Sequence, residues 1–186
     1  DGLRAVLVPK AESAEELAAV AGALPGVPLV PLIETAAGLA ACAAIARSPH
    51  VERLAFGALD FGADVAATST TILDFARCRI VVESRAAGLP APWDSPNPEF
   101  HDGDVVRQSA RAARALGFGG QLCIHPSQVA VVAEAFHPTS DEIAWARRVI
   151  DIDGQGGAVQ LDGTMVDRPV LLRAHAILQH LEEGAG

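Results

Sequence analysis

Short apolar runs alternate along this chain with segments of helical periodicity, and this alternation limits the folds open to it. Five apolar runs have the length and composition of buried strands, and each is followed by a helical pattern. Repeated strand–helix units form a parallel sheet with right-handed crossovers. The predicted strands span residues 4–8, 28–33, 53–56, 91–93 and 121–124, and the predicted helices span residues 14–23, 37–47, 70–87, 104–116 and 127–136.

Capping patterns support these helix limits. Residues 13–16 and 139–142 each run from a hydroxyl residue to a glutamate, which is the spacing of a capping box at a helix start. The second of these boxes predicts a further helix over residues 141–150. Gly88 and Gly117 follow helical runs, at the position where a C-terminal cap favours glycine.

The number of units leaves two architectures open. A (β/α)8 barrel needs about 250 residues, so five units form either an open doubly wound sheet or the C-terminal part of a barrel. After the helix over 141–150 come a glycine-rich stretch at 153–157, a short apolar run at 158–161, a turn at Asp162-Gly163 and a last helix over 169–181. An open sheet does not need this extension. We therefore predict an α/β fold, with part of a TIM barrel in residues 1–150 and a C-terminal lid in residues 151–186.

The composition excludes several kinds of partner. Apolar residues make up 50% of the chain, but no apolar run approaches the roughly 20 residues that a membrane span needs. The net charge of -9 argues against a nucleic acid partner. The beginning of the sequence resembles neither a signal peptide nor a transit peptide, so we expect a cytoplasmic location. The cysteines lie far apart in apolar or helical patterns, which predicts reduced and mostly buried thiols; they are Cys42, Cys78 and Cys123.

Two carboxylates follow neighbouring predicted strands. Glu34 comes directly after the strand over 28–33, and Asp60 follows the apolar run that contains the strand over 53–56. If both strands belong to one parallel sheet, both carboxylates lie at its carboxyl edge, where α/β folds bind ligands. Two carboxylates at one edge are enough to anchor a hard cation such as Mg²⁺. The alternative is that each residue is only a helix cap or a turn residue.

A set of longer motifs is more specific than any single residue. They are, in chain order, VLVPKAES, PLIETAAGL, AFGALDFGADV, ARCRIVVESRAAGLPAPWD, GFGGQLCIHPSQVAVVAEAFHPTSDEIAWARRVI and GTMVDRPVLLRAH. Together they resemble the citrate lyase β-subunit-like proteins of the HpcH/HpaI aldolase/citrate lyase superfamily. The resemblance implies the last five units of a (β/α)8 barrel and a C-terminal lid. It also implies that roughly the first third of a family member, with its substrate-clamping arginine, is absent from this sequence.

The same resemblance implies an activity and a set of site residues. Family members use Mg²⁺ to cleave or form a carbon–carbon bond in a 3-hydroxyacyl-CoA such as citryl-, malyl- or citramalyl-CoA. Glu34 and Asp60 match the metal ligands of the family. Asp167 matches the general base, which the lid of a neighbouring subunit supplies, so a homotrimer or hexamer is implied. A thioesterase or synthase on the same scaffold, a class II 2-oxo-acid aldolase and a non-catalytic paralogue remain alternatives.

Further residues are candidate contacts for the CoA thioester or small oxo-acid substrate, namely Lys10, Asp94, His125 and Pro126. Each has a structural alternative. Lys10 could be solvated or ion-paired, Asp94 could be a structural carboxylate, and His125 with Pro126 could shape a loop by hydrogen bonding to backbone. In the same way, Asp167 could simply cap the last helix.

The chain departs from the family pattern beside Asp60. The family commonly has Gly-Ala-Glu-Asp-Leu, whereas residues 57–61 read Gly-Ala-Leu-Asp-Phe. Leu59 therefore removes a second acidic group, which puts any role of that group in tuning the metal or binding substrate in doubt. Asp64 is expected to start a helix rather than to bind metal. The loop after Asp94 contains no tyrosine, although the family often has one there.

Overall fold

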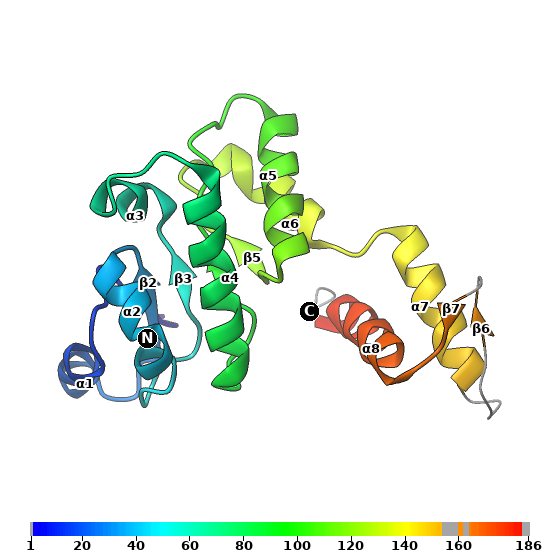
Figure 1. Ribbon diagram of the computed structural model, residues 1–186, viewed down its shortest axis with the longest axis horizontal. Helices are drawn as coiled ribbons and strands as arrows, with labels where there is room; N and C mark the ends of the chain where they lie inside the picture. The colour runs from blue at the N-terminus through cyan, green and yellow to red at the C-terminus, as the bar shows by residue number, and fades with distance from the viewer. Residues whose placement is uncertain (1, 154–159, 162–163, 184–186) are drawn as a thin grey trace. The chain divides into compact units, whose positions relative to one another are not determined.

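Five parallel strands form one sheet, and their order in space follows their order in the chain (Figure 1). The computed structural model describes residues 2–153, 160–161 and 164–183. A doubly wound sheet reverses its strand order at a switch point, whereas a TIM barrel adds each strand beside the one before it. The sequential order of the strands therefore indicates the barrel arrangement and not the open doubly wound sheet. The strands are β1 (Val6–Val8), β2 (Leu29–Ile33), β3 (Ala55–Phe56), β4 (Trp93–Asp94) and β5 (Gly120–Gln121).

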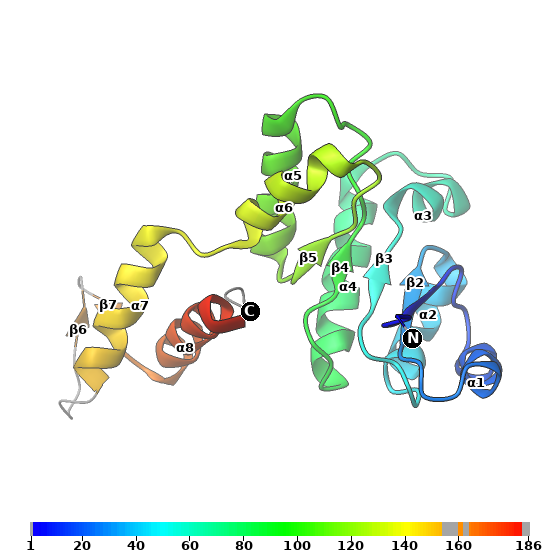
Figure 2. The ribbon, with the colours of Figure 1, turned by 180° about the vertical axis from the view of Figure 1, so that it is seen from behind.

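Helices follow the strands, and the predicted ones are confirmed to within about one residue at most ends. The predicted helices are α1 (Ala14–Ala23), α2 (Ala36–Ala46), α4 (Thr70–Ala86), α5 (Gly103–Leu116) and α6 (Pro126–Phe136). A further helix, α3 (Ala58–Asp64), lies between β3 and α4. Seen from behind, the strands lie in front of α2 and α4, so these two helices cover the same face of the sheet (Figure 2). The short helix α3 was not predicted.

The strands are shorter than predicted, because only residues that pair with a neighbour belong to the ladder. Trp93 pairs with both Ala55 and Gly120, and Asp94 pairs with Gln121. Asp94 is therefore part of β4 itself. The predicted strand over 121–124 is correct only at Gln121, since β5 spans Gly120–Gln121 and the chain then turns toward α6.

The capping patterns act as predicted. The backbone N–H of Glu16 donates to Ser13 Oγ at 3.2 Å and starts α1. The start of α2 has a cap that was not predicted, in which the N–H of Gly38 donates to Thr35 Oγ1 at 3.0 Å. Gly117 ends α5 in the left-handed region with φ +102°, which glycine adopts without strain.

The core lies between the sheet and its covering helices. Apolar side chains from β2, β3 and the helices pack there at close to zero exposure. This burial provides the main favourable contribution to folding. The largest of these side chains are Leu17, Leu29, Ile33, Ile45, Leu54, Phe56, Phe61 and Ile80.

Residues from His137 onward form a second compact unit. It contains α7 (Ser140–Asp153), the antiparallel pair β6 (Gln160–Leu161) and β7 (Thr164–Met165), and α8 (Arg168–Glu183). Thr139 and Glu142 form the predicted capping box, each accepting the backbone N–H of the other. Helix α7 belongs to this unit because it packs against α8 through Val149 and Ile177. The predicted division at residue 150 into catalytic part and lid stays a prediction about function.

Two expectations lie outside the described residues, namely the glycine-rich stretch beyond Asp153 and the Asp162-Gly163 turn. The prediction of mostly buried thiols is wrong. Only Cys42 is buried, whereas Cys78 and Cys123 are exposed because they lie on the outer face of α4 and in the turn after β5. Among the helices that the structure describes, none combines the length and the hydrophobicity that a transmembrane span requires.

Candidate active site

Glu34 leaves the carboxyl end of β2 and is only 5% exposed. The backbone N–H of Lys10 donates to its Oε1 at 2.9 Å. Lys10 holds this position with φ +47°, a left-handed conformation that non-glycine residues seldom adopt. Burial raises the pKa of the Glu34 carboxyl above its usual value, and the Lys10 hydrogen bond only partly opposes this effect.

Gly57 makes the room that Glu34 occupies. A Cβ atom at Gly57 would lie 2.6 Å from Glu34 Oε2 and 2.7 Å from Glu34 Cβ. Outside their own residue and its two chain neighbours, real Cβ atoms essentially never come within 3.0 Å of a heavy atom. The glycine after β3 therefore lets the backbone of that strand pass directly beside the carboxylate at the end of β2.

Asp60 lies in the first turn of α3, directly after β3, and is exposed. Its negative charge is close enough to raise the pKa of Glu34 further. Strands β2 and β3 are neighbours in the sheet, with Ile33 paired to Phe56, so the predicted meeting of the two carboxylates at one edge is confirmed. Phe61 anchors α3 in the core, 5.6 Å from Phe56 between ring centroids.

This pair fits a hard divalent cation. Mg²⁺ is usually held by one or two carboxylates and keeps several positions for water and substrate oxygens. The described residues contain no group of three or more metal-binding side chains, so water and substrate would complete the coordination. A cation would also offset the repulsion between Glu34 and Asp60 and the cost of burying the Glu34 charge. The metal role of the two residues stays a prediction.

Asp94 is 3% exposed and is bound within the protein. Arg77 Nε, on α4, donates to both of its carboxylate oxygens at 3.0 and 3.1 Å, and the N–H of Ser95 donates to Oδ1 at 2.8 Å. Burial nevertheless raises the pKa of Asp94, against the opposing effect of Arg77. These contacts agree with the structural alternative for Asp94, and a contact of this residue with substrate stays a prediction.

Arg77 has a role at this edge of the sheet that was not predicted from the sequence. Besides Asp94 it contacts Asp74 at 3.1 Å, and its guanidinium lies 5.4 Å from the centre of the Phe56 ring. Hydrogen bonds from arginine to a carboxylate are charge-assisted and therefore stronger than those between neutral groups. No local pattern distinguishes Arg77 from the other arginines of α4, because its partner is separated from it by 17 residues.

His125 and Pro126 start helix α6. The N–H of Ser127 donates to His125 Nδ1 at 3.2 Å, which caps the helix, and Pro126 is its first residue. The imidazole also stacks on Phe100 at 4.9 Å between ring centroids. This is the loop-shaping alternative of the sequence analysis. The exposed ring is still accessible to a ligand, and substrate binding by His125 and Pro126 stays a prediction.

Gln128 fixes the loops after β4 and β5 to each other. Its side chain is buried, accepts the N–H of Ile124 at 2.9 Å and donates to the carbonyls of Asn97 and Glu99 at 2.8 and 2.7 Å. This role could not be predicted from the sequence, since a glutamine in the first turn of a helix carries no signal for such distant contacts.

An open pocket of about 720 Å³ lies beside α3. A volume of this size suits a small-molecule ligand. Leu59 projects there with 84% exposure, so the position that is commonly acidic in the family presents an apolar surface here. The remaining wall comes from α4 and from the loops after β4 and β5, and includes Leu73, Arg77, Ser95, Pro96 and Ile124.

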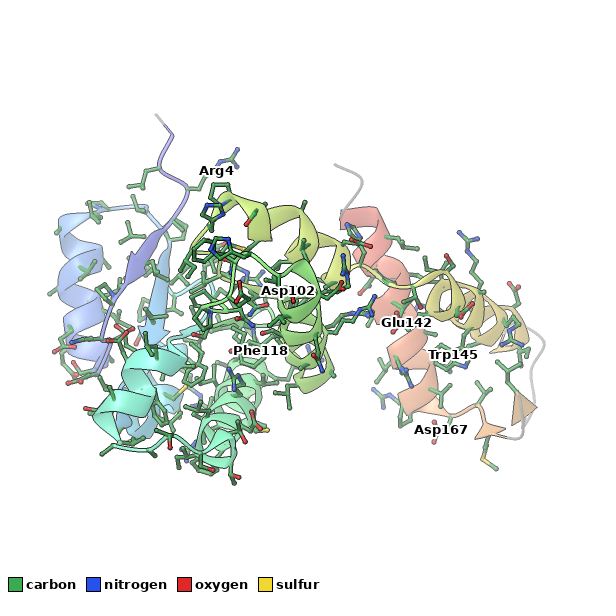
Figure 3. All side chains as sticks on the ribbon, turned by 90° about the horizontal axis from the view of Figure 1, so that it is seen from above. Arg4, Asp102, Phe118, Glu142, Trp145 and Asp167 are labelled. Atoms are coloured by element: carbon green, nitrogen blue, oxygen red, sulfur yellow. The ribbon has the colours of Figure 1, made fainter. Side chains whose placement is uncertain are left out.

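Asp167 lies in the second unit and caps α8 (Figure 3). Its Oδ1 accepts the N–H of Val170 at 3.2 Å, and its carbonyl accepts the N–H of Leu171 at 3.0 Å. The side chain is exposed. The capping alternative is therefore observed, and the catalytic role of Asp167 stays a prediction.

Comparison with known proteins agrees with this geometry. Residues 1–126 match the family model described as HpcH/HpaI aldolase/citrate lyase. The chain belongs to this family. The citrate lyase subunit beta-like protein of Deinococcus radiodurans is 35% identical over 96% of this chain and 66% of its own length. The mitochondrial citramalyl-CoA lyase of Rattus norvegicus is 38% identical over 69% of this chain and 40% of its own length.

A solved structure shows the family fold. The CitE protein of Mycobacterium tuberculosis, crystallised with magnesium, acetoacetate and coenzyme A, is 32% identical and superimposes with a TM-score of 0.85. The match covers 96% of this chain and 68% of that one. The present chain thus spans about two-thirds of the length of the Deinococcus radiodurans and Mycobacterium tuberculosis proteins, and it has the fold of the latter over that part.

Proposed function

We propose that the protein of which this chain is part is a Mg²⁺-dependent carbon–carbon lyase that acts on a 3-hydroxyacyl-CoA. The observation that carries the proposal is the pairing of Glu34 and Asp60 at the carboxyl ends of adjacent strands in a member of this family. Helix α3, which carries Asp60, also lines an open pocket through Ala58, Leu59 and Gly62. The related CitE protein was crystallised with magnesium and coenzyme A, and a relative is a citramalyl-CoA lyase.

In this proposal the carboxylates of Glu34 and Asp60 hold the cation. When bound, Mg²⁺ supplies Lewis-acid polarisation of the hydroxyl and carboxylate oxygens of the substrate. The Lys10 N–H keeps one Glu34 oxygen oriented, and Gly57 lets the carboxylate lie against β3. The pocket beside α3 receives part of the acyl-CoA chain, with Leu59 as an apolar wall.

Proton transfer is assigned to Asp167. A general base must take the proton of the 3-hydroxyl group while the neighbouring carbon–carbon bond breaks. The electron pair of that bond goes to the acyl-CoA carbon, which takes up a proton, and the hydroxyl carbon becomes the carbonyl of the oxo acid. We propose that Asp167 acts in a neighbouring subunit, and hence that the protein is a homotrimer or hexamer. We further propose that Lys10, His125 and Pro126 contact the substrate, and a cytoplasmic location stays a prediction.

An activity screen of the full-length protein tests the proposal. Citryl-, malyl- and citramalyl-CoA are each incubated with and without Mg²⁺, and both products are quantified. We expect one substrate to give acyl-CoA and an oxo acid only when Mg²⁺ is present. Release of free CoA with the intact hydroxy acid would instead identify a thioesterase. Cleavage that persists without divalent cations, or no turnover of any of the substrates, would contradict the proposal.

A further inference from the structure

Helix α3, which carries Asp60, is tied to the rest of the sheet edge at both of its ends. Gly57 precedes the helix and offers no side chain to cap it. Instead, Ser95 Oγ, from the loop after β4, accepts the N–H of Ala58 at 3.0 Å. At the other end, Asp64 Oδ2 accepts the N–H of Ala36 at 2.7 Å. A helix of seven residues has little stability of its own, so these ties matter for its position.

The bond between Asp64 and Ala36 joins the two elements that carry the candidate metal ligands. Ala36 is the first residue of α2 and lies two residues after Glu34. Asp64 is the last residue of α3 and lies four residues, about one helical turn, after Asp60. One hydrogen bond therefore links the backbone that follows Glu34 to the helix that presents Asp60.

Asp64 is well suited to this link. The first N–H groups of α2 have no partner within the helix, and the helix start attracts negative charge. The Thr35 hydroxyl accepts the N–H of Gly38, and the Asp64 carboxylate, from a distant part of the chain, accepts the N–H of Ala36. Asp64 was expected to start a helix; it ends α3 and instead caps the start of α2.

We propose that Asp64 is a positioning residue, whose bond to Ala36 fixes Asp60 at the distance from Glu34 that a divalent cation requires. This inference rests on the metal site of the proposed function. It assigns Asp64 no contact with the metal or the substrate. Residues that only orient metal ligands often change metal affinity by about 10- to 100-fold when they are replaced.

Metal binding to the full-length protein tests this role without any substrate. The probe is Mn²⁺ alone, followed by calorimetry, and the thermal stability of the metal-free protein is measured in parallel. Asp64→Ala removes the acceptor, and we expect Mn²⁺ to bind about tenfold more weakly or worse. Asp64→Asn keeps an oxygen that can accept the Ala36 N–H, and we expect it to restore most of the affinity.

Asp102→Ala is the matched control. Asp102 is likewise an exposed aspartate that caps a helix, since its Oδ1 accepts the N–H of Asp104 at 2.9 Å at the start of α5 (Figure 3). It lies away from the two candidate ligands in the sequence, and its side chain accepts the N–H groups of Asp104 and Val105 within α5. We expect this variant to lower the melting temperature to a similar extent while Mn²⁺ affinity stays unchanged.

The possible outcomes separate this inference from the proposed function. If Glu34→Ala leaves Mn²⁺ binding intact, the proposed metal site itself is wrong. If Glu34→Ala abolishes binding but Asp64→Ala binds Mn²⁺ as tightly as the parent protein, only the positioning role is overturned. If Asp64→Asn binds as weakly as Asp64→Ala, Asp64 acts through its charge, and the positioning role is again overturned.

Discussion

Replacing Gly57 with alanine places one methyl group against Glu34 and changes little else. The backbone of Gly57 has φ -112° and ψ 83°, so alanine meets no positive-φ strain there. The added Cβ would stand 2.6 Å from Glu34 Oε2 and 2.7 Å from Glu34 Cβ, while ordinary contact begins at 3.4 Å. The two segments must therefore separate by about 0.7 Å or more.

This displacement determines how much stability and activity the Gly57→Ala protein should lose. Glu34 Cβ is close to the backbone of β2 and cannot swing away like the end of a flexible side chain, so the strand end or the start of α3 has to move. Inserting a methyl group into a well-packed site costs about 1–3 kcal/mol of stability. A misplacement approaching 1 Å in an active site can cost about 100-fold in kcat/KM.

The assay combines urea unfolding, Mg²⁺ titration and steady-state kinetics on the full-length protein. Gly22→Ala serves as the control, because Gly22 lies in α1 with nothing within 4 Å of the added atom. That variant should gain about 0.5–1 kcal/mol of stability, since alanine is the better helix residue. The two substitutions thus change stability in opposite directions.

A Gly57→Ala protein that is as stable as the parent and binds Mg²⁺ with unchanged affinity would contradict this prediction. That result would mean that Glu34 and α3 are not in close contact. If Gly57→Ala loses stability but still binds Mg²⁺ with the affinity of the parent, the contact between position 57 and Glu34 is confirmed and Glu34 is excluded as a metal ligand.

Three other predictions concern buried groups. Burial raises the pKa of Glu34, so the folded metal-free protein loses stability as the pH rises from below 4.5 through the raised pKa. Glu34→Gln should therefore be more stable than the parent protein at neutral pH. A melting curve that shows Glu34→Gln to be less stable there would contradict this prediction. Arg77→Met leaves the Asp94 carboxylate buried without its cation and should lower the free energy of unfolding in urea by about 3–5 kcal/mol. The double variant Arg77→Met with Asp94→Asn should recover part of that stability. A double variant that recovers none of it would contradict the role of this ion pair. Burial raises the pKa of Cys42 to about 12. A thiol reagent should therefore modify Cys78 and Cys123 in the native protein, and Cys42 only after unfolding. Rapid modification of all three cysteines in the native protein would contradict this prediction.

Much of the fold could be predicted from the sequence because its signals are local. Apolar runs of strand length and helical periods of ten residues or more alternate cleanly, and the capping residues lie within three residues of the groups they cap. The same alternation placed Glu34 and Asp60 at one edge of the sheet. Helix α3 was missed because its seven residues include Gly62 and are too few to show a period.

The parts of the site that could not be predicted depend on contacts between distant residues. Three hydrogen-bonded pairs are far apart in the sequence: Arg77 and Asp94 by 17 residues, Gln128 and Asn97 by 31, and Asp64 and Ala36 by 28. Nothing in the immediate sequence of these residues indicates their partners. Likewise, the need for glycine at position 57 arises only because β2 and β3 bring Glu34 beside it.

The central claim is that Glu34 and Asp60 together hold a divalent cation, and calorimetric Mg²⁺ titration of the full-length protein tests it most directly. We expect the parent protein to bind Mg²⁺, and Glu34→Ala and Asp60→Ala each to lose that binding while remaining folded by circular dichroism. The exposed Glu15→Ala, in the first turn of α1, should bind like the parent. Undiminished Mg²⁺ binding by folded Glu34→Ala or Asp60→Ala protein would contradict the claim.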